Sequence, residues 1–311
     1  MTTARTFAVA LAGLDGAIVE VEADLTAQTP KFTIIGLPDK SLGEAAQRVT
    51  NACANSELPL SKRRLTVNLS PASLPKHGSG FDVAIAVAAL ATEMTLDAES
   101  LAHTVHVGEL GLDGRLRPVP GILPAVVAAA RAGHRRVVVP HANADEAALV
   151  EGIEVIAAAS LSAVILAHGG DVEVPDVSPV PARGIARAAE PPLELADVIG
   201  QPEAVDALVI AAAGGHHLLL SGPPGAGKTM LARRLPAILP DLDDADALSA
   251  ACVRSLSGAA VSRLDRTPPW EAPHHSASVA ALVGGGSRVV RPGAIARASG
   301  GVLFLDEAGE F

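Results

Sequence analysis

A glycine-rich segment that ends in a lysine and a threonine is the most chemically informative part of the sequence. It consists of Gly222, Pro223, Pro224, Gly225, Ala226, Gly227, Lys228 and Thr229, and it matches the pattern G-x-x-x-x-G-K-[ST] in full. Glycines let backbone amides turn toward phosphate oxygens, the lysine reaches the β- and γ-phosphates, and the threonine hydroxyl is a magnesium ligand. A plain glycine turn requires neither Lys228 nor Thr229. We therefore expect this loop, with Met230 directly behind it, to bind nucleotide.

Two adjacent carboxylates follow an apolar run near the end of the sequence. The run Gly301 to Leu305 precedes Asp306 and Glu307, which is typical of a buried parallel strand. By itself this signal is weak, because many strands end in acidic turns. Together with the upstream loop it predicts ATP hydrolysis, in which Asp306 shares Mg²⁺ with Thr229 and Glu307 polarises the attacking water. Lys228 and Glu307 are the predicted catalytic residues.

Other reactive residue types do not form a second site in the sequence. His274 and His275 are adjacent, but neighbouring histidines rarely converge on one ion and no Cys, Asp or third His stands nearby. We interpret this segment as a loop of unknown role. Cys53 and Cys252 lie far apart, which predicts free thiols and a cytoplasmic protein.

Composition excludes several classes of protein. The length of 311 residues predicts two domains, and a hydrophobic content of 49% predicts that they are globular. Only 2% are aromatic and the net charge is −10, so neither aromatic base stacking nor bulk positive charge supports nucleic-acid binding. The basic triplet Lys62 to Arg64 is best interpreted as a solvated edge. No apolar run approaches the ~20 residues of a membrane span, and we expect no signal peptide.

Residues 171–192 are rich in proline, which predicts a linker between two domains. The helices and strands that must position the residues named above lie before and after this linker. Residues 1–170 predict an α+β domain and residues 193–311 an α/β nucleotide-binding domain. In the first domain we expect strands at 7–11, 17–23, 32–35, 65–69, 105–109 and 136–139, and helices at 42–55, 82–92, 123–132 and 144–150. In the second domain we expect a helix from Pro202, a strand at 217–220 and a helix at 230–235.

Several long stretches resemble one protein family. They include LTVNLSPASLPKHGSGFDVAIA, VGELGLDGRLRPVPG, SGPPGAGKTMLARRLPAILP and PGAIARASGGVLFLDE, and together they resemble the bacterial ComM/YifB family within the magnesium-chelatase-like branch of AAA+ P-loop ATPases. The resemblance implies ATP and Mg²⁺ as ligands. It also implies that Asp197 to Gln201 lies beside adenine, with Val198 and Ile199 in contact with the base; a turn before a helix is the alternative.

The first domain resembles the proteolytic domain of Lon, which has a ribosomal-protein-S5 domain 2-like fold. Such a protease needs a serine nucleophile and a lysine base. In this sequence the nucleophile position falls on Gly80, and no lysine stands in the matching region, residues 121–125. Ser79 lies next to the nucleophile position. We expect a non-proteolytic domain used for assembly or partner contact.

The family resemblance implies a hexameric DNA motor that drives branch migration of recombination intermediates during natural transformation. A magnesium-chelatase-type motor subunit and a nucleotide-binding regulatory or chaperone-like protein remain as alternatives. An AAA+ module continues through a sensor strand, an arginine finger and a helical lid, so we expect the module in residues 193–311 to be incomplete. Loss of an arginine finger lowers comparable rates by roughly 10³–10⁵, and hydrolysis by these residues alone is expected to be slow.

Overall fold

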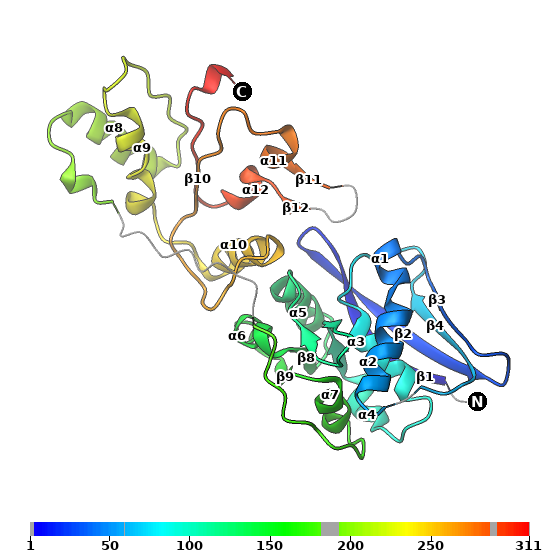
Figure 1. Cartoon of the computed structure of the whole chain (residues 1–311). Helices are drawn as coiled ribbons and strands as arrows, with labels where there is room; N and C mark the ends of the chain where they lie inside the picture. Colours follow the sequence, from blue (N-terminus) through cyan, green and yellow to red (C-terminus); the bar gives the residue numbers. More distant parts are fainter. Residues whose placement is uncertain (1–2, 59, 182–192, 287–290, 311) are drawn as a thin grey trace. The chain divides into compact units, whose positions relative to one another are not determined.

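The computed structural model describes residues 3–58, 60–181, 193–286 and 291–310. Its internal contacts divide the chain into two units (Figure 1). Unit 1 comprises Met1–Ile185 with Ser255–Arg263, and unit 2 comprises Ala186–Arg254 with Leu264–Phe311. Residues 182–192 of the expected linker lie outside the described residues, and the domain boundaries drawn from the sequence stay a prediction.

Unit 1 is built on a seven-stranded mixed sheet with the order β3-β4-β2-β1-β5-β8-β9. The pairs β1–β2 and β2–β4 are antiparallel, whereas β3–β4, β1–β5, β5–β8 and β8–β9 are parallel. A short hairpin, β6 with β7, lies apart from this sheet. The strands span Thr3–Ala12 (β1), Asp15–Thr26 (β2), Lys31–Ile35 (β3), Arg64–Ser70 (β4), Thr104–His106 (β5), Glu109–Leu110 (β6), Leu116–Arg117 (β7), Arg136–Pro140 (β8) and Glu154–Ala158 (β9).

The sheet buries apolar side chains on both faces. Along β8, Val138 belongs to one hydrophobic cluster while Val137 and Val139 belong to the other, as the alternation of side chains along a strand requires. Helices α2, α3 and α7 contribute side chains to the first cluster and α5 contributes to the second. The helices span Lys40–Gly43 (α1), Ala45–Asn55 (α2), Asp82–Leu90 (α3), Ala98–Ala102 (α4), Ile122–Arg131 (α5), Ala144–Ala147 (α6) and Leu161–Ala167 (α7), with a 3₁₀ turn at His141–Asn143.

Most elements expected in the first domain are confirmed, within a residue or a few at their ends. The strand expected at 105–109 is wrong in its extent: β5 ends at His106, because the Gly108 amide donates to the Gly80 carbonyl oxygen at 2.9 Å instead of continuing the sheet. The helix expected at 42–55 is interrupted at Glu44, between α1 and α2. Sequence analysis missed α4, β9 and α7.

Unit 2 contains short elements joined by long connections. Its helices are Pro202–Gly214 (α8), Lys228–Ala232 (α9), Asp244–Leu256 (α10, whose last two residues group with unit 1), Val279–Val283 (α11) and Ala294–Arg297 (α12). The 3₁₀ turns are Leu195–Asp197, Leu235–Ile238 and Ala308–Glu310. Strand β10 (Trp270–Glu271) pairs in parallel with β13 (Val302–Leu303), and β11 (Gly284–Gly285) pairs antiparallel with β12 (Arg291–Pro292).

Three local expectations for the second domain are wrong. Residues 217–220 form no strand, because no other described strand pairs with this segment to satisfy its backbone groups. Within this segment, the Leu219 side chain is 87% exposed. The helix expected at 230–235 begins earlier and ends at Ala232. The strand expected at 301–305 is limited to the half-buried β13, and Leu305 is exposed. The helix from Pro202 is confirmed.

Among the described residues, no helix is both long enough and apolar enough to cross a membrane.

Candidate functional site

The glycine loop has a backbone conformation that its glycines make accessible. Gly225 and Gly227 adopt φ values of 80° and 82°, in the left-handed region that side chains other than glycine rarely enter. The Lys228 ammonium donates to the carbonyl oxygens of Gly222 at 2.8 Å and Pro223 at 3.0 Å. These bonds draw the lysine back across its own loop. The loop is largely exposed, so its amides and the lysine are accessible to a phosphate chain.

The structure brings the two expected metal ligands together. The Thr229 hydroxyl, in the first turn of α9, lies 3.4 Å from the Asp306 carboxylate, which follows β13. Hydroxyl and carboxylate oxygens are the hard donors that Mg²⁺ accepts, usually together with water and substrate phosphates. The pair therefore fits a magnesium ion at the end of the loop, and its role as a ligand set stays a prediction.

The segment expected beside adenine is tied to the loop by a residue that sequence analysis did not single out. The Gln201 side-chain amide donates to the Ala226 carbonyl oxygen at 3.2 Å. Val198 is half-buried, whereas Ile199 is 96% exposed. An isoleucine this exposed is available for an apolar ligand. Sequence analysis placed Gln201 at the end of this segment, before Pro202 where the chain enters α8, but gave its side chain no role.

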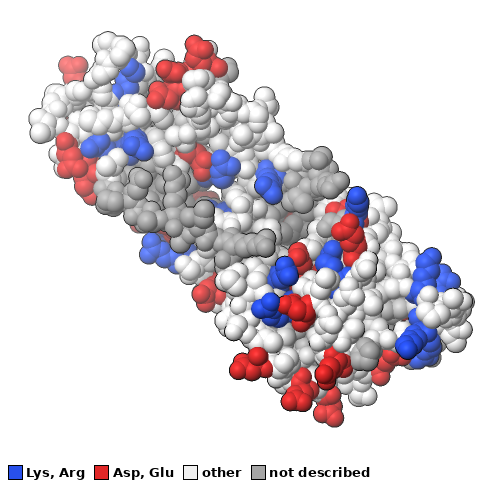
Figure 2. Space-filling view, in the orientation of Figure 1, with Lys and Arg blue, Asp and Glu red and all other residues white. Residues whose placement is uncertain are grey.

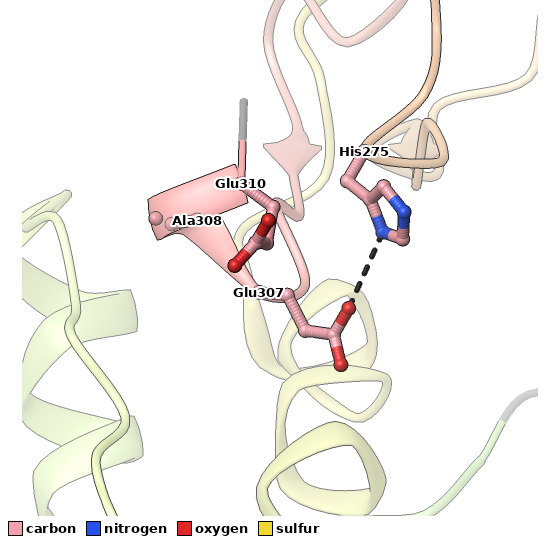
Figure 3. A pocket seen from close by; sticks show the side chains of 5 residues that line it. His275, Glu307, Ala308 and Glu310 are labelled. Atoms are coloured by element: carbon pink, nitrogen blue, oxygen red, sulfur yellow. Dashed lines mark ion pairs between the residues drawn. The ribbon is translucent and has the colours of Figure 1, made fainter.

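Glu307 does not face the glycine loop in this structure. Its carboxylate lies 3.2 Å from the His275 ring nitrogen Nδ1, and Figure 3 shows the two side chains directed at each other. They line an open pocket of about 380 Å³ together with Ala308, Gly309 and Glu310. Sequence analysis left His275 without a role, because the contact joins residues that are 32 positions apart in the sequence. Among the described residues, no group of three or more His, Cys, Asp and Glu side chains suits a metal ion.

The region of unit 1 that resembles the Lon active site contains a carboxylate that sequence analysis missed. The Ser79 hydroxyl donates to the Glu109 carboxylate, and Gly80, at the expected nucleophile position, accepts a backbone bond from Gly108. Ser79 therefore has a carboxylate within hydrogen-bond reach, a contact that the sequence did not predict. Glu109 is, however, a carboxylate and not the lysine of a Lon dyad.

Lys76, the nearest lysine in sequence to Ser79, is committed elsewhere. Its buried ammonium donates to the carbonyl oxygens of Gly36 at 2.9 Å, Leu69 at 3.0 Å and Pro71. Burial lowers the pKa of Lys76. Because all three protons have acceptors, in residue 36 and in residues 69–71, Lys76 has none left to exchange with Ser79.

A partly buried ion pair lies beside this region, in which the Asp82 side chain is buried and the Arg48 side chain is 19% exposed. Arg48 donates to both carboxylate oxygens of Asp82, at 2.7 and 2.9 Å, and the Leu110 amide donates to the same carboxylate. Burial raises the pKa of Asp82 to about 6, against the opposing effect of Arg48. This pair connects α2 to the start of α3, so we assign it to the stability of unit 1.

Basic side chains form no broad surface on the face shown in Figure 2, where blue and red groups are interspersed among white ones. Within the basic triplet, Arg63 pairs with Glu93 at 3.0 Å and Arg64 donates to the Gln28 side chain at 2.8 Å. These contacts agree with a solvated edge. Contact with DNA gains no support from this triplet.

Both parts of the chain match models of known protein families. Residues 194–311 match a family model described as magnesium chelatase, subunit ChlI, and residues 21–143 match one described as subunit ChlI of Mg-chelatase. The whole chain is 47% identical to an uncharacterized protein of Mycobacterium tuberculosis and 42% identical to competence protein ComM of Haemophilus influenzae, and covers 61% of each. It is 42% identical to the uncharacterized protein YifB of Escherichia coli over 96% of the chain and 58% of that protein.

A weaker similarity reaches the Lon proteases. A peroxisomal Lon protease homolog 2 of Caenorhabditis elegans is 30% identical over 147 residues, which are 45% of this chain and 18% of that protein. The chain thus spans about three fifths of the length of its full-chain relatives and a small part of the Lon homologue.

Proposed function

Because the chain belongs to the ComM/YifB family of magnesium-chelatase-like AAA+ proteins, we propose that it binds ATP with Mg²⁺ and hydrolyses it. The observation that carries the proposal is the convergence of the glycine loop with a carboxylate: Thr229 and Asp306 lie within 3.4 Å although 77 residues separate them. A structural glycine turn requires no such partner. The resemblance seen in the sequence and the geometry support the same site.

In the proposed reaction, each loop residue has a distinct task. Backbone amides between Gly222 and Thr229 bind the phosphate chain, and Lys228 exchanges its two carbonyl partners for the β- and γ-phosphates. Thr229 and Asp306 hold Mg²⁺, which neutralises charge on the phosphate oxygens when bound. Glu307 orients and polarises the attacking water. Val198 and Ile199 supply apolar contact to the adenine ring.

We further propose that hydrolysis drives remodelling of DNA by a homohexamer, with branch migration of recombination intermediates as the specific activity. The similarity to a protein named for competence supports this proposal. The charge of the chain does not add to it, since the net charge is −10.

The test uses the protein expressed from its complete gene. ATP hydrolysis is measured with and without branched DNA, for the wild type, Lys228→Ala and Glu307→Gln. We expect Lys228→Ala to weaken nucleotide binding at least about tenfold, as loss of charge-assisted hydrogen bonds does. Glu307→Gln is expected to retain binding and to lower kcat by about 10²–10⁴-fold. Branched DNA is expected to stimulate the wild type.

Three outcomes would count against parts of this proposal. Undiminished nucleotide affinity in Lys228→Ala removes the loop from the site. Full activity in Glu307→Gln removes hydrolysis at this carboxylate. Stimulation by a porphyrin substrate in place of DNA would favour the chelatase-type motor, which the description of the matching family models keeps as the second candidate.

A further inference from the structure

The connection between β2 and β3 passes the beginning of β4 and forms a pocket there. Strands β2 and β3 pair with β4 from opposite sides, so that Thr26 and Lys31 are both Cα partners of Arg64. Neighbouring strands are about 5 Å apart, and β2 and β3 are therefore separated by about 10 Å. Residues 27–30 span this separation, and a pocket of about 410 Å³ lies at this end of the sheet.

The side chains of this pocket are cationic or neutral, and most of them donate hydrogen bonds. Its lining consists of Gln28, Thr29, Pro30, Lys31 and Arg64. The Arg64 guanidinium donates to the Gln28 side-chain oxygen at 2.8 Å, which holds it beside the connection and occupies one of its five N–H groups. The other N–H groups of Arg64, the Lys31 ammonium and the Thr29 hydroxyl are donors for a ligand oxygen.

Neither cation of the pocket is neutralised by a carboxylate. Among the described residues, no ion pair includes Lys31 or Arg64, nor the exposed Lys62 that precedes them along β4. The neighbouring Arg63 differs, because it pairs with Glu93 at 3.0 Å. The positive charge at this end of the sheet is therefore available to an anion.

The strand register fixes where the two cations lie. Lys31 and Arg64 are directly paired across β3 and β4, so their side chains leave the same face of the sheet from adjacent positions. Asp24 lies on this face of β2, but its Cα partner is Thr66, two positions beyond Arg64. That diagonal spacing is about 7–8 Å, which is longer than an ion pair. The cations are thus held together on rigid elements, as a preorganised site requires.

The donors of the pocket suit one class of ligand. An arginine fork binds two oxygens of the same phosphate, and a lysine adds a compact positive charge. A third donor from a hydroxyl matches the tetrahedral arrangement of phosphate oxygens. A cationic ligand would be repelled by the two side chains, and an apolar ligand would leave their charges without partners.

We propose that this pocket binds a phosphate group, carried either by a small ligand or by the backbone of a nucleic acid. The basic triplet alone does not form the site, since Lys31 of β3 and the connection 27–30 complete it. The inference goes beyond the proposed ATPase and does not depend on it, because no residue of the pocket belongs to unit 2. With one bidentate and one single contact, we expect a dissociation constant on the order of 1 mM for inorganic phosphate.

The test measures protection of individual side chains in the protein expressed from its complete gene. Lysines are labelled with an amine-reactive reagent and arginines with phenylglyoxal, and each site is quantified by peptide mass spectrometry. Labelling is compared in inorganic phosphate, pyrophosphate, a single-stranded oligonucleotide, and sodium chloride of matched ionic strength, which controls for screening. We expect 10 mM phosphate to slow labelling of Lys31 and Arg64 at least about threefold relative to chloride. Lys228 is quantified separately, so binding at the glycine loop is not mistaken for binding here.

Two variants separate this site from general positive charge. Arg64→Gln removes the guanidinium but retains a side chain that hydrogen-bonds, and we expect it to abolish most of the protection of Lys31 by phosphate. Arg63→Gln is the matched control, because it removes the adjacent arginine that is already paired with Glu93. We expect it to leave the protection of Lys31 unchanged.

Equal labelling in chloride and in all three phosphate-containing ligands overturns the proposal. So does protection of Lys31 that persists in Arg64→Gln, or that is lost to the same degree in Arg63→Gln. Protection by phosphate or pyrophosphate supports a small ligand, and protection by the oligonucleotide alone supports a nucleic-acid backbone. If Arg64→Gln does not fold, Lys31→Gln, read at Arg64, decides by the same criterion. Failure of the proposed ATPase appears separately, as hydrolysis that does not depend on Lys228.

Discussion

A buried pair of histidines in unit 1 predicts that this unit loses stability in mild acid. The His106 and His168 rings face each other with their Nε2 atoms 2.8 Å apart, and the remaining nitrogens lie 2.7 Å from the hydroxyls of Thr6 and Ser100. Both residues are at most 1% exposed. When both rings are neutral, every group is satisfied if all hydrogen bonds in the row Thr6, His106, His168 and Ser100 run in the same direction. Once both rings are protonated, each Nε2 carries a hydrogen and the two N–H groups point at each other.

The size of this loss in the free energy of unfolding follows from the pKa values of the two histidines. Burial lowers the pKa of His168 from 6.5 to about 4 and that of His106 well below 6.5. Between pH 6.5 and about 4 the unfolded chain therefore binds more protons than the folded one, and the free energy of unfolding falls as the pH falls. For His168 the loss approaches about 3 kcal/mol at the lower end of this range. The contribution is fully present above pH 6.5.

Asp82 titrates in the same window with the opposite sign. Burial raises its pKa from 3.8 to about 6, so the stability that it contributes is present at low pH and is lost as the pH rises toward 6. The free energy of unfolding of unit 1 therefore contains both the contribution of the histidines and that of Asp82. The difference between the wild type and His168→Gln removes the contribution of Asp82, which is common to both proteins, and reports the pair of histidines.

We expect His168→Gln to be less stable than the wild type at pH 7, since it loses a buried ring and the bond to Ser100, and the difference to shrink by up to about 3 kcal/mol by pH 4. Hydrogen exchange of amides in β1, β5 and β8, corrected for the intrinsic effect of pH, reports the opening free energy of this unit. A stability difference that does not change between pH 7 and 4 would refute the reasoning.

Three further changes test contacts in both units. Arg48→Leu leaves the buried Asp82 carboxylate without its guanidinium partner and should lower the free energy of unfolding by about 3–5 kcal/mol, measured by chemical denaturation; a loss below about 1 kcal/mol would contradict a structural role of this pair. Lys76→Met leaves three carbonyl oxygens without a donor and should cost about 3 kcal/mol or more, whereas unchanged stability would mean that water replaces the ammonium. Asp306→Asn should weaken binding of magnesium nucleotide about tenfold with little effect on metal-free nucleotide, and equal weakening of both would exclude Asp306 as a metal ligand in calorimetric titration.

Sequence patterns predicted the elements of unit 1 better than those of unit 2. Strands β2 and β4 have clear alternation and antiparallel neighbours, so their pattern and their environment agree. The segment 217–220 has an equally apolar sequence, but strand formation also requires a paired neighbour, and none is present among the described residues. Strand β9 was missed because it lies at the edge of the sheet, where its burial pattern is irregular.

Some residues of the candidate site could likewise be predicted from sequence patterns, and others could not. The loop from Gly222 to Thr229 could be predicted from eight consecutive positions, since its chemistry depends on local spacing. Gln201, Glu109 and His275 could not, because each acquires its partner from a segment more than 20 residues away.

The sequence by itself determined the family of this protein and the proposed identity of its phosphate-binding residues, because both can be recognised from motifs of consecutive residues. Only the tertiary structure decided that Thr229 meets Asp306, that Glu307 turns to His275 and that Lys76 is committed to backbone carbonyls. The physical reason is that hydrogen bonds and ion pairs require approach within about 3–4 Å, and strand register and packing set that approach between distant parts of the chain.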